Sequence, residues 1–198
     1  MRLNKRAKPV YAFIDSQNLN VSTQRLGWKM DWRKFRQYLT DDYHVTKAFM
    51  FIGYVPEFEA MYEQLHQAGF LIVLKPTYDM TRPRPEDAPA DPKDDKGSKT
   101  SEEDKKPTKG NIDADLVLWA MKELPNYSKA VIVSGDGDFF SLVEYLDEQH
   151  KLLKLLAPSN YYSSLYNKYD RYIERLDHHR HELAYGFRRR TSKPPQPN

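Results

Sequence analysis

The chain has 198 residues, of which 39% are apolar and 30% charged, and its formal net charge is +3. This length predicts one domain with a substantial core. The absence of cysteine excludes disulfide bonds and zinc–thiolate sites and favours a reducing compartment. No apolar run approaches the ~18 residues that cross a bilayer, and the basic N-terminus lacks the apolar segment of a signal peptide. The composition therefore predicts a soluble, cytoplasmic protein.

Short apolar runs alternate with amphipathic segments in the first half of the chain. The expected strands are 9–14, 45–54 and 70–76, and the expected helices are 31–39 and 58–69. Asp31 is the predicted N-cap of the first of these helices, and Gly69 is the predicted stop of the second. The strands are continuous apolar runs, which is typical of strands buried on both faces.

Composition changes between Tyr78 and Thr108, where large apolar residues almost disappear and Pro, Asp, Lys and Glu dominate. Such a segment buries too little apolar surface to order itself. We interpret residues 78–108 as a disordered charged insertion within one domain, because the segments on either side look like complementary halves of one sheet. Two roles stay open for it, gating of a site and binding of a protein partner.

The second half of the chain continues the same alternation of strands and helices. The expected strands are 129–134 and 151–158, the expected helices are 113–124, 138–149 and 173–187, and a tyrosine-rich turn or helix is expected over 160–168. The whole pattern predicts an α/β fold with a central parallel sheet of about five strands and helices on both faces. Ligands in such sheets bind at the carboxyl ends of the strands, where the strand order reverses.

Both ends of the chain are basic. We expect a basic N-terminal tail over 1–8, a domain over 9–187 and a basic disordered tail over 188–198. Such tails add non-specific attraction to a polyanion, although solvated ends that keep a protein soluble have the same composition.

Four aspartates stand at strand ends or helix starts that this topology brings to one edge of the sheet. Asp15 ends the first strand, Asp136 and Asp138 follow the fourth strand in the sequence SGDGD, and Asp113 begins the helix after the insertion. Any one of them has an ordinary explanation as a helix cap, which stabilises by about 1 kcal/mol. Four carboxylates crowded at one edge repel each other unless a cation shares their charge, so the set favours a Mg²⁺ or Mn²⁺ site.

Four further residues are candidates for supporting roles. Asn18 lies where it could orient a metal-bound water, Ser134 supports the SGDGD turn, and Lys109 could reach a phosphate. Ordinary helix-start and surface roles stay open for Asn18 and Lys109. Asp115 is a second choice behind Asp113, because two residues along a helix correspond to about 200° of rotation and the two carboxylates cannot easily face one site.

The stretch YYSSLYNKYDRY, residues 161–172, mixes aromatic and basic side chains. Aromatic rings in such a setting stack on the bases of single-stranded nucleic acid. The alternative is that half of these tyrosines simply pack against the last helix.

The stretches FIDSQNLN, KGNIDADLVLWAM and VIVSGDGDFFSLVEYL resemble the three motifs of NYN domains of the LabA-like kind, within the PIN-like nuclease group. The resemblance covers roughly residues 9–176, with the motifs in the family's order. It implies a Rossmann-like, three-layer PIN-type fold and a metal-dependent ribonuclease. It maps the family's acidic residues onto Asp15, Asp113, Asp136 and Asp138, and the family's asparagine onto Asn18. The chain departs from the family at Trp119, where many members carry a further acid.

The expected function is Mg²⁺- or Mn²⁺-dependent hydrolysis of RNA phosphodiester bonds, endonucleolytic and on single-stranded RNA. One or two metal ions held by the aspartates would lower the pKa of a bound water and stabilise charge on the phosphate. Asp15 and Asp136 are the preferred direct ligands. A catalytically weak or inactive module that binds RNA or a protein partner is one alternative, and a phosphatase or nucleotidase is another. The sequence leaves open whether the protein forms homo-oligomers.

Overall fold

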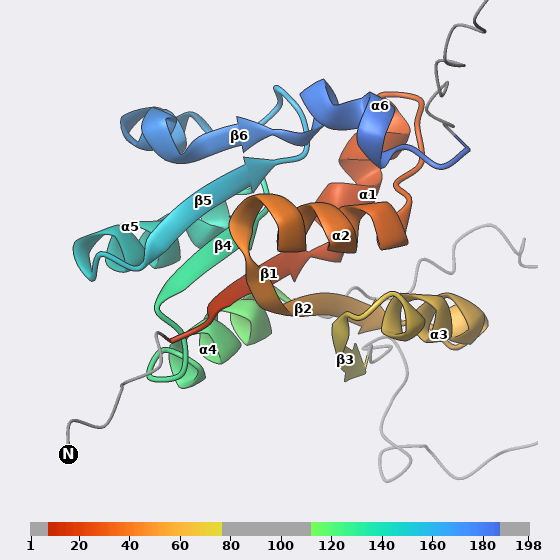
Figure 1. The fold of residues 1–198 in the computed structure, drawn as a ribbon, viewed down its shortest axis with the longest axis horizontal. Helices are drawn as coiled ribbons and strands as arrows, with labels where there is room; N and C mark the ends of the chain where they lie inside the picture. The colour runs from red at the N-terminus through yellow and green to blue at the C-terminus, as the bar shows by residue number, and fades with distance from the viewer. Residues whose placement is uncertain (1–7, 77–111, 187–198) are drawn as a thin grey trace, which may run out of the picture.

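The computed structural model describes residues 8–76 and 112–186 (Figure 1). The charged segment 78–108, Lys109 and the predicted tails, apart from Lys8, lie outside these residues. The described residues therefore belong to the domain predicted over 9–187, and they end at Gly186.

Six parallel strands form one sheet in the order β3-β2-β1-β4-β5-β6. The strands are β1 Val10–Asp15, β2 Val45–Tyr54, β3 Leu71–Pro76, β4 Lys129–Val133, β5 Leu152–Ala157 and β6 Ile173–Arg175. The chain runs outward from β1 to β3 at one edge, returns to form β4 on the other side of β1, and then runs outward to β6. The strand order therefore reverses between β1 and β4, as in doubly wound folds.

Six α-helices and several 3₁₀ segments connect the strands in the described residues. The helices are α1 Ser16–Arg25, α2 Trp32–Tyr43, α3 Glu59–Gln67, α4 Asp113–Lys122, α5 Phe140–Glu148 and α6 Arg180–Leu183, and the 3₁₀ segments are Pro56–Phe58, Gly137–Phe139, Ser164–Tyr172 and Leu176–His179. Asp31 caps α2 as predicted, since its Oδ1 accepts hydrogen bonds from the amides of Arg33 and Lys34 at 3.1 and 3.2 Å. None of the described helices has the length and apolar character needed to cross a membrane.

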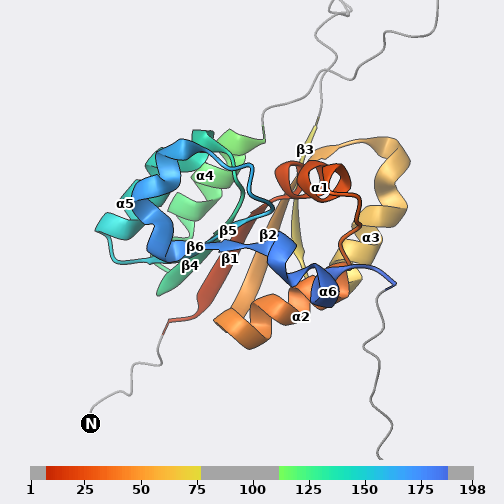
Figure 2. The same cartoon turned by 90° about the horizontal axis from the view of Figure 1, so that it is seen from above.

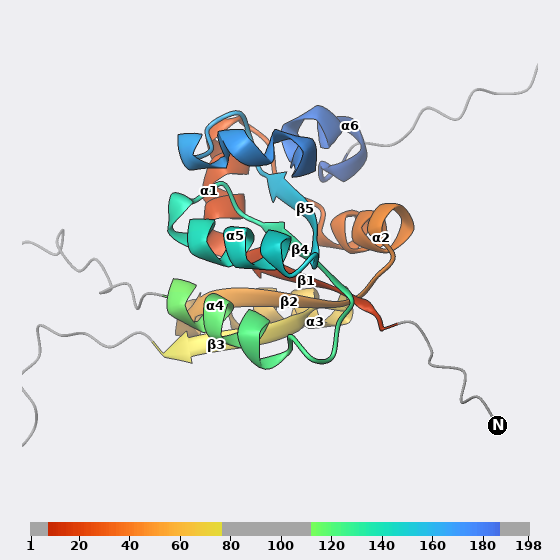
Figure 3. The ribbon, with the colours of Figure 1, turned by 90° about the vertical axis from the view of Figure 1, so that its left-hand side faces the viewer.

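Helices cover both faces of the sheet. Helices α1, α2, α3 and α6 share one hydrophobic cluster with the sheet, and α4, α5 and the 3₁₀ segment 164–172 share the other. Figure 2 shows the two groups of helices on either side of the strands, and Figure 3 shows α4 and α5 separated from α2 by the sheet. The predicted α/β, three-layer fold with a parallel sheet is confirmed.

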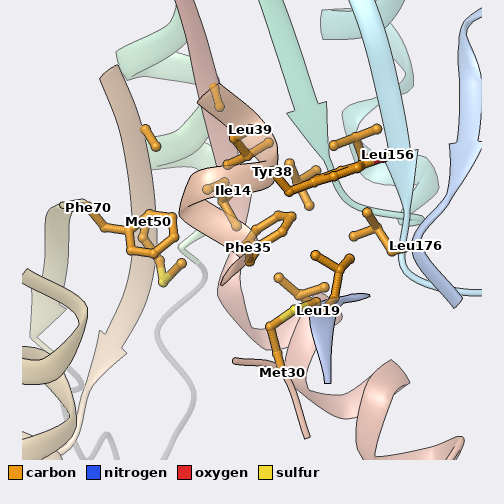
Figure 4. Close-up of a cluster of buried hydrophobic side chains, with 14 of the residues drawn as sticks. Ile14, Leu19, Met30, Phe35, Tyr38, Leu39, Met50, Phe70, Leu156 and Leu176 are labelled. Carbon is orange, nitrogen blue, oxygen red and sulfur yellow. The ribbon is translucent and has the colours of Figure 1, made fainter. Parts of the chain in front are cut away.

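Strands β1 to β5 contribute side chains to both hydrophobic clusters, because successive side chains point to opposite faces. On one face Ile14 and Met50 pack with Phe35 of α2 and Leu19 of α1 (Figure 4). On the other face Phe13 belongs to the second hydrophobic cluster, which the sheet shares with α4 and α5. Burial on both faces explains why the strands are continuous apolar runs in the sequence.

The prediction of a C-terminal helix over 173–187 is wrong, and the sheet has six strands where about five were expected. Residues 173–175 form β6, which pairs with β5 and is followed by the 3₁₀ segment Leu176–His179 and the short helix α6. Within β6, Glu174 pairs with Lys154 of the neighbouring strand β5 at 3.3 Å. Tertiary contacts at the sheet edge outweigh the local helical pattern.

Candidate active site

The carboxyl ends of β1 and β4 lie side by side at the point where the strand order reverses. Ile14 of β1 is in register with Val133 of β4. Asp15 is the last residue of β1, and Ser134 follows β4 directly. Both residues therefore lie at the edge of the sheet where doubly wound folds bind ligands.

Asp15 is a buried carboxylate, only 4% exposed, whose orientation is fixed by two hydrogen bonds. The Ser134 hydroxyl donates to its Oδ2 at 3.0 Å, and the Asn18 amide donates to its Oδ1 at 3.0 Å, so Asp15 also caps α1. Burial raises the pKa of Asp15 above its ordinary value, and repulsion from Asp136 raises it further despite these hydrogen bonds. The site thus holds a carboxylate in a setting that disfavours its charge.

The turn after β4 is held to Asp15 and α1 by a short network. The Asp136 amide donates to the Ser134 Oγ at 3.1 Å, and the Gly135 amide donates to the Asn18 Oδ1 at 2.9 Å. The Asp138 amide donates to the Asp136 Oδ1 at 3.1 Å. Asn18 therefore ties the first turn of α1 to the SGDGD turn, and Ser134 bridges Asp15 to the Asp136 backbone.

The two glycines of this turn are needed for close packing against the segment 161–163. A Cβ on Gly135 would lie 3.1 Å from the Tyr162 Cβ, and a Cβ on Gly137 would lie 2.6 Å from the Ser163 Oγ. The Ser163 amide also donates to the Gly135 carbonyl at 2.9 Å. A side chain at either glycine would push the two segments apart.

Three carboxylates from different elements line one pocket of about 250 Å³, which we call the carboxylate pocket. Asp15 comes from the end of β1, Asp136 from the turn after β4, and Asp113 from the start of α4 on the other face of the sheet. Its remaining lining includes Asn18, Arg25, Ser159 and Tyr161. The fold thus brings together three of the four predicted aspartates across the carboxyl edge of the sheet.

Asp138 and Asp115 do not line this pocket. Asp138 is exposed, and its contact to the turn is the backbone hydrogen bond to Asp136. Asp115 pairs with Lys75 of β3 at 2.8 Å, and it lies about 200° around α4 from Asp113. Asp115 therefore has a structural partner at the edge of the sheet.

Sequence reasoning missed the pocket residues Arg25 and Ser159, and it included Tyr161 only as part of the stretch 161–172. Arg25 could have been predicted from the sequence, because Asn18, Ser22 and Arg25 follow each other at helical spacing and share one face of α1. Ser159 and Tyr161 come from the loop after β5, where no local pattern shows which residues turn toward β4.

A larger cavity, of about 920 Å³, lies along the edge strand β3 and is lined by side chains of α3 and α4. Trp119 lines it and packs against Phe49 of β2, with ring centroids 5.6 Å apart. Trp119, where the sequence resemblance led us to expect a further acid, thus faces this cavity and not the carboxylate pocket. The cavity's charges, among them Lys47 and Glu59, are mixed in sign and lie away from the point where the strand order reverses.

The carboxylate pocket has the donor chemistry of a Mg²⁺ or Mn²⁺ site. Within residues 8–76 and 112–186, no set of three or more His, Asp or Glu side chains is grouped closely enough to hold a metal ion by protein ligands alone. Mg²⁺ is usually bound by one or two carboxylates, with waters and substrate phosphates completing its six ligands. Asp15 and Asp136 meet that smaller requirement, and their mutual repulsion is what a bound cation would relieve.

Comparisons with known proteins agree with the fold. The sequence model of the NYN domain matches residues 9–177. A solved structure of a protein of unknown function from Vibrio parahaemolyticus, VPA0982, has a TM-score of 0.64 and 18% identity, and the match covers 92% of this chain and 99% of that one. This likeness shows the shared fold. No curated protein matches the chain.

Proposed function

Because this chain belongs to the NYN domain family, within the PIN-like nuclease group, we propose that it is a metal-dependent ribonuclease. Its proposed reaction is hydrolysis of phosphodiester bonds within single-stranded RNA. The proposed metal is Mg²⁺ or Mn²⁺, and the proposed site is the carboxylate pocket with Asp15, Asp113, Asp136 and the neighbouring Asp138.

The observation that carries this proposal is the burial of Asp15 beside Asp136. Asp15 is 4% exposed, its pKa is raised by burial and by Asp136, and no basic side chain is among the causes of that shift. A structural carboxylate in such a position normally has a cationic partner, because an uncompensated buried charge is costly. Two adjacent carboxylates at a ligand-binding sheet edge are best explained by a cation that binds there in the working enzyme.

Asp15 and Asp136 are the residues that would hold the metal, which supplies Lewis-acid stabilisation of the phosphate and lowers the pKa of a bound water. Ser134 and the Asn18 amide fix the direction of the Asp15 carboxylate. The Asn18 side chain holds the Gly135 turn and so sets the position of Asp136. These contacts fix the two carboxylates before substrate arrives, so less free energy is spent on ordering them.

Asp113 and Arg25 line the same pocket, and we assign the attacking water to Asp113 and the RNA phosphate to Arg25. Asp113 orients the attacking water by accepting a hydrogen bond from it. Arg25 binds a phosphate oxygen of the RNA through its guanidinium, which suits phosphate geometry. Asp138 contributes through its amide to Asp136, and its exposed carboxylate acts through water.

A binding module without catalysis is the second candidate, and one observation favours it. The described residues do not group three acidic or histidine ligands around one point. A domain that had lost catalysis would keep the fold and the basic residues that attract RNA. Metal dependence of cleavage separates the two candidates.

The test is cleavage of a labelled single-stranded RNA by wild-type protein in Mn²⁺, Mg²⁺ or EDTA, beside Asp136→Asn and Asp42→Asn. Asp42 is an exposed aspartate on α2 outside the pocket lining and serves as the matched control. We expect wild type and Asp42→Asn to cleave with either metal and not in EDTA. Asp136→Asn should cleave at least about 100-fold more slowly, because it removes a carboxylate that would hold the metal needed to activate water and stabilise charge on the phosphate.

Cleavage by Asp136→Asn as fast as by wild type would contradict the assignment of the cleavage to the carboxylate pocket. Absence of cleavage by wild type in every metal, with RNA still bound, would establish the binding module. Hydrolysis of a small phosphomonoester in place of RNA would point to a phosphatase.

A further inference from the structure

The tyrosine-rich stretch 161–172 divides into two kinds of residue. Tyr166 and Tyr169 are 0% and 5% exposed and belong to the hydrophobic cluster shared with α4 and α5. Tyr161 is 69% exposed, yet it lines the carboxylate pocket. The packing explanation therefore accounts for the two buried tyrosines and leaves the role of Tyr161 open.

The backbone of Tyr161 packs against the SGDGD turn after β4. The Tyr161 amide donates to the Oγ of Ser159 at 3.1 Å, and Ser159 is only 2% exposed. A Cβ on Gly135 would lie 3.3 Å from the Tyr161 carbonyl oxygen, and the Ser163 amide donates to the Gly135 carbonyl. An exposed ring on a backbone that packs against Gly135 in this way is preorganised for a ligand.

The size of the pocket indicates where the base of a bound nucleotide lies. At about 250 Å³ the pocket is smaller than the roughly 300–1,000 Å³ typical of sites that enclose an organic ligand. It has room for a phosphate beside the carboxylates and Arg25. The attached base then lies at the rim, where Tyr161 is exposed.

We propose that Tyr161 is the stacking platform for an unpaired nucleobase of the RNA whose phosphate lies in the carboxylate pocket. The inference rests on the proposed function. Every nucleobase has a flat π-face, so stacking on tyrosine tolerates any sequence. A base within a duplex is covered on both faces by its neighbours, so this platform selects single-stranded or locally unpaired RNA.

The test measures RNA affinity in a cleavage-deficient background, so that binding is read separately from catalysis. Fluorescence anisotropy measures the Kd of a short labelled single-stranded RNA for the Asp136→Asn protein. The same measurement is made on this protein combined with Tyr161→Ala, Tyr161→Phe or Tyr185→Ala. Tyr185 is the matched control, because it is 73% exposed and does not line the pocket. Thermal unfolding checks that each variant is folded, which the exposure of both tyrosines leads us to expect.

Loss of a stacking ring weakens binding by roughly 5- to 150-fold in Kd. We expect Tyr161→Ala to show a loss in this range, and Tyr161→Phe to stay within about twofold of the parent because it keeps the ring. Tyr185→Ala should be unchanged. An RNA of the same length with bases removed should bind the parent more weakly, and it should bind Tyr161→Ala with little further loss.

Three results would overturn the inference. Unchanged affinity in Tyr161→Ala, with metal-dependent cleavage by wild type intact, would remove the stacking platform and leave the proposed function standing. An equal loss in Tyr161→Ala and Tyr161→Phe would assign the effect to the hydroxyl and not to the ring. Absence of both RNA binding and cleavage in wild type would overturn the proposed function and this inference together.

Discussion

Two buried or half-buried carboxylates at different strands of one sheet have opposite surroundings. Asp15, at the end of β1, is 4% exposed and has Asp136 as a charged neighbour, and its pKa is raised. Glu174, on the edge strand β6, lies near Lys154 at 3.3 Å and His179 at 3.0 Å and accepts a hydrogen bond from Tyr38 at 2.9 Å. Burial alone would raise the pKa of Glu174, but hydrogen bonds from tyrosines and Lys154 outweigh it, so the pKa is lowered.

The comparison distinguishes two kinds of carboxylate. Glu174 stabilises the fold, whereas Asp15 and Asp136 are held in place by the fold at a cost in stability. Around Glu174 the chain supplies the Lys154 ammonium and tyrosine hydroxyl donors, so ionisation of Glu174 stabilises the native state. Around Asp15 the chain supplies two donors and a second carboxylate, so ionisation of Asp15 opposes folding until a cation binds. Stability given up at one site in this way is characteristic of functional sites.

The largest expected effect on stability comes from removing the charge of Glu174. Glu174→Gln should lower the free energy of unfolding by about 2 kcal/mol at pH 7, because it weakens charge-assisted hydrogen bonds to a side chain that is 27% exposed. The folded pKa of Glu174 is lowered, so this stabilisation is present above the unfolded pKa of about 4.3 and is lost as pH falls through the folded value. Urea unfolding at several pH values measures it.

The result that would contradict this prediction is a Glu174→Gln protein as stable as wild type at pH 7. RNA cleavage by this variant should equal that of wild type at a temperature where both are folded, because Glu174 does not line the carboxylate pocket.

The opposite sign is expected for Asp15→Asn in the absence of divalent metal. Its folded pKa is raised, so wild type loses stability relative to the variant as pH rises from about 4, and the loss is complete above the raised pKa. We expect the variant to be more stable by about 1 kcal/mol at pH 7 in EDTA, and equal to wild type at pH 3. Asparagine can still accept from the Asn18 amide, and the Ser134 hydroxyl can accept from its amide group.

A stability difference between Asp15→Asn and wild type that does not change with pH would show that the charge of Asp15 is compensated in the native protein. Asp113, Asp136 and Arg25 line the same pocket, so Arg25→Gln should enlarge the pH-dependent difference if Arg25 partly compensates Asp15. Unfolding in EDTA at pH 3, 5 and 7 resolves both points.

The smallest expected effect is on RNA affinity when Arg25 is neutralised. Arg25→Gln should weaken binding a few-fold and reduce the slope of log K against log salt by about 0.7, the value for one phosphate contact on a single strand. Arg33→Gln, which removes an exposed arginine on α2 outside the pocket, should leave the slope unchanged. Equal slopes for wild type and Arg25→Gln would remove Arg25 from the phosphate site.

Much of this fold was predictable from the sequence because buried parallel strands leave continuous apolar runs. The runs that became β1, β2, β3, β4 and β5 were recognised for that reason. The edge strand β6 was missed because it has three residues, all only half-buried, and carries Glu174 and Arg175. Its stability depends on β5 and on Lys154, contacts that no local pattern contains.

The carboxylate pocket was predictable in part for a related reason. Asp15 ends one apolar strand and Asp136 lies in the turn after another, and the strand order then brings them together. Arg25 was detectable from its helical spacing to Asn18, whereas Tyr161 was not separable from the buried tyrosines beside it. That separation depends on the contacts of residues 159–163 with Gly135, which arise only in the folded chain.

Binding of Mn²⁺ tests most directly whether the carboxylates at the reversal of strand order are held for a cation. Isothermal titration of Mn²⁺ into wild type, Asp15→Asn and Glu174→Gln compares the two sites in one experiment. We predict that wild type and Glu174→Gln bind Mn²⁺ with equal affinity and that Asp15→Asn binds at least about tenfold more weakly. Equal binding by Asp15→Asn and wild type would contradict the assignment of the metal to the carboxylate pocket.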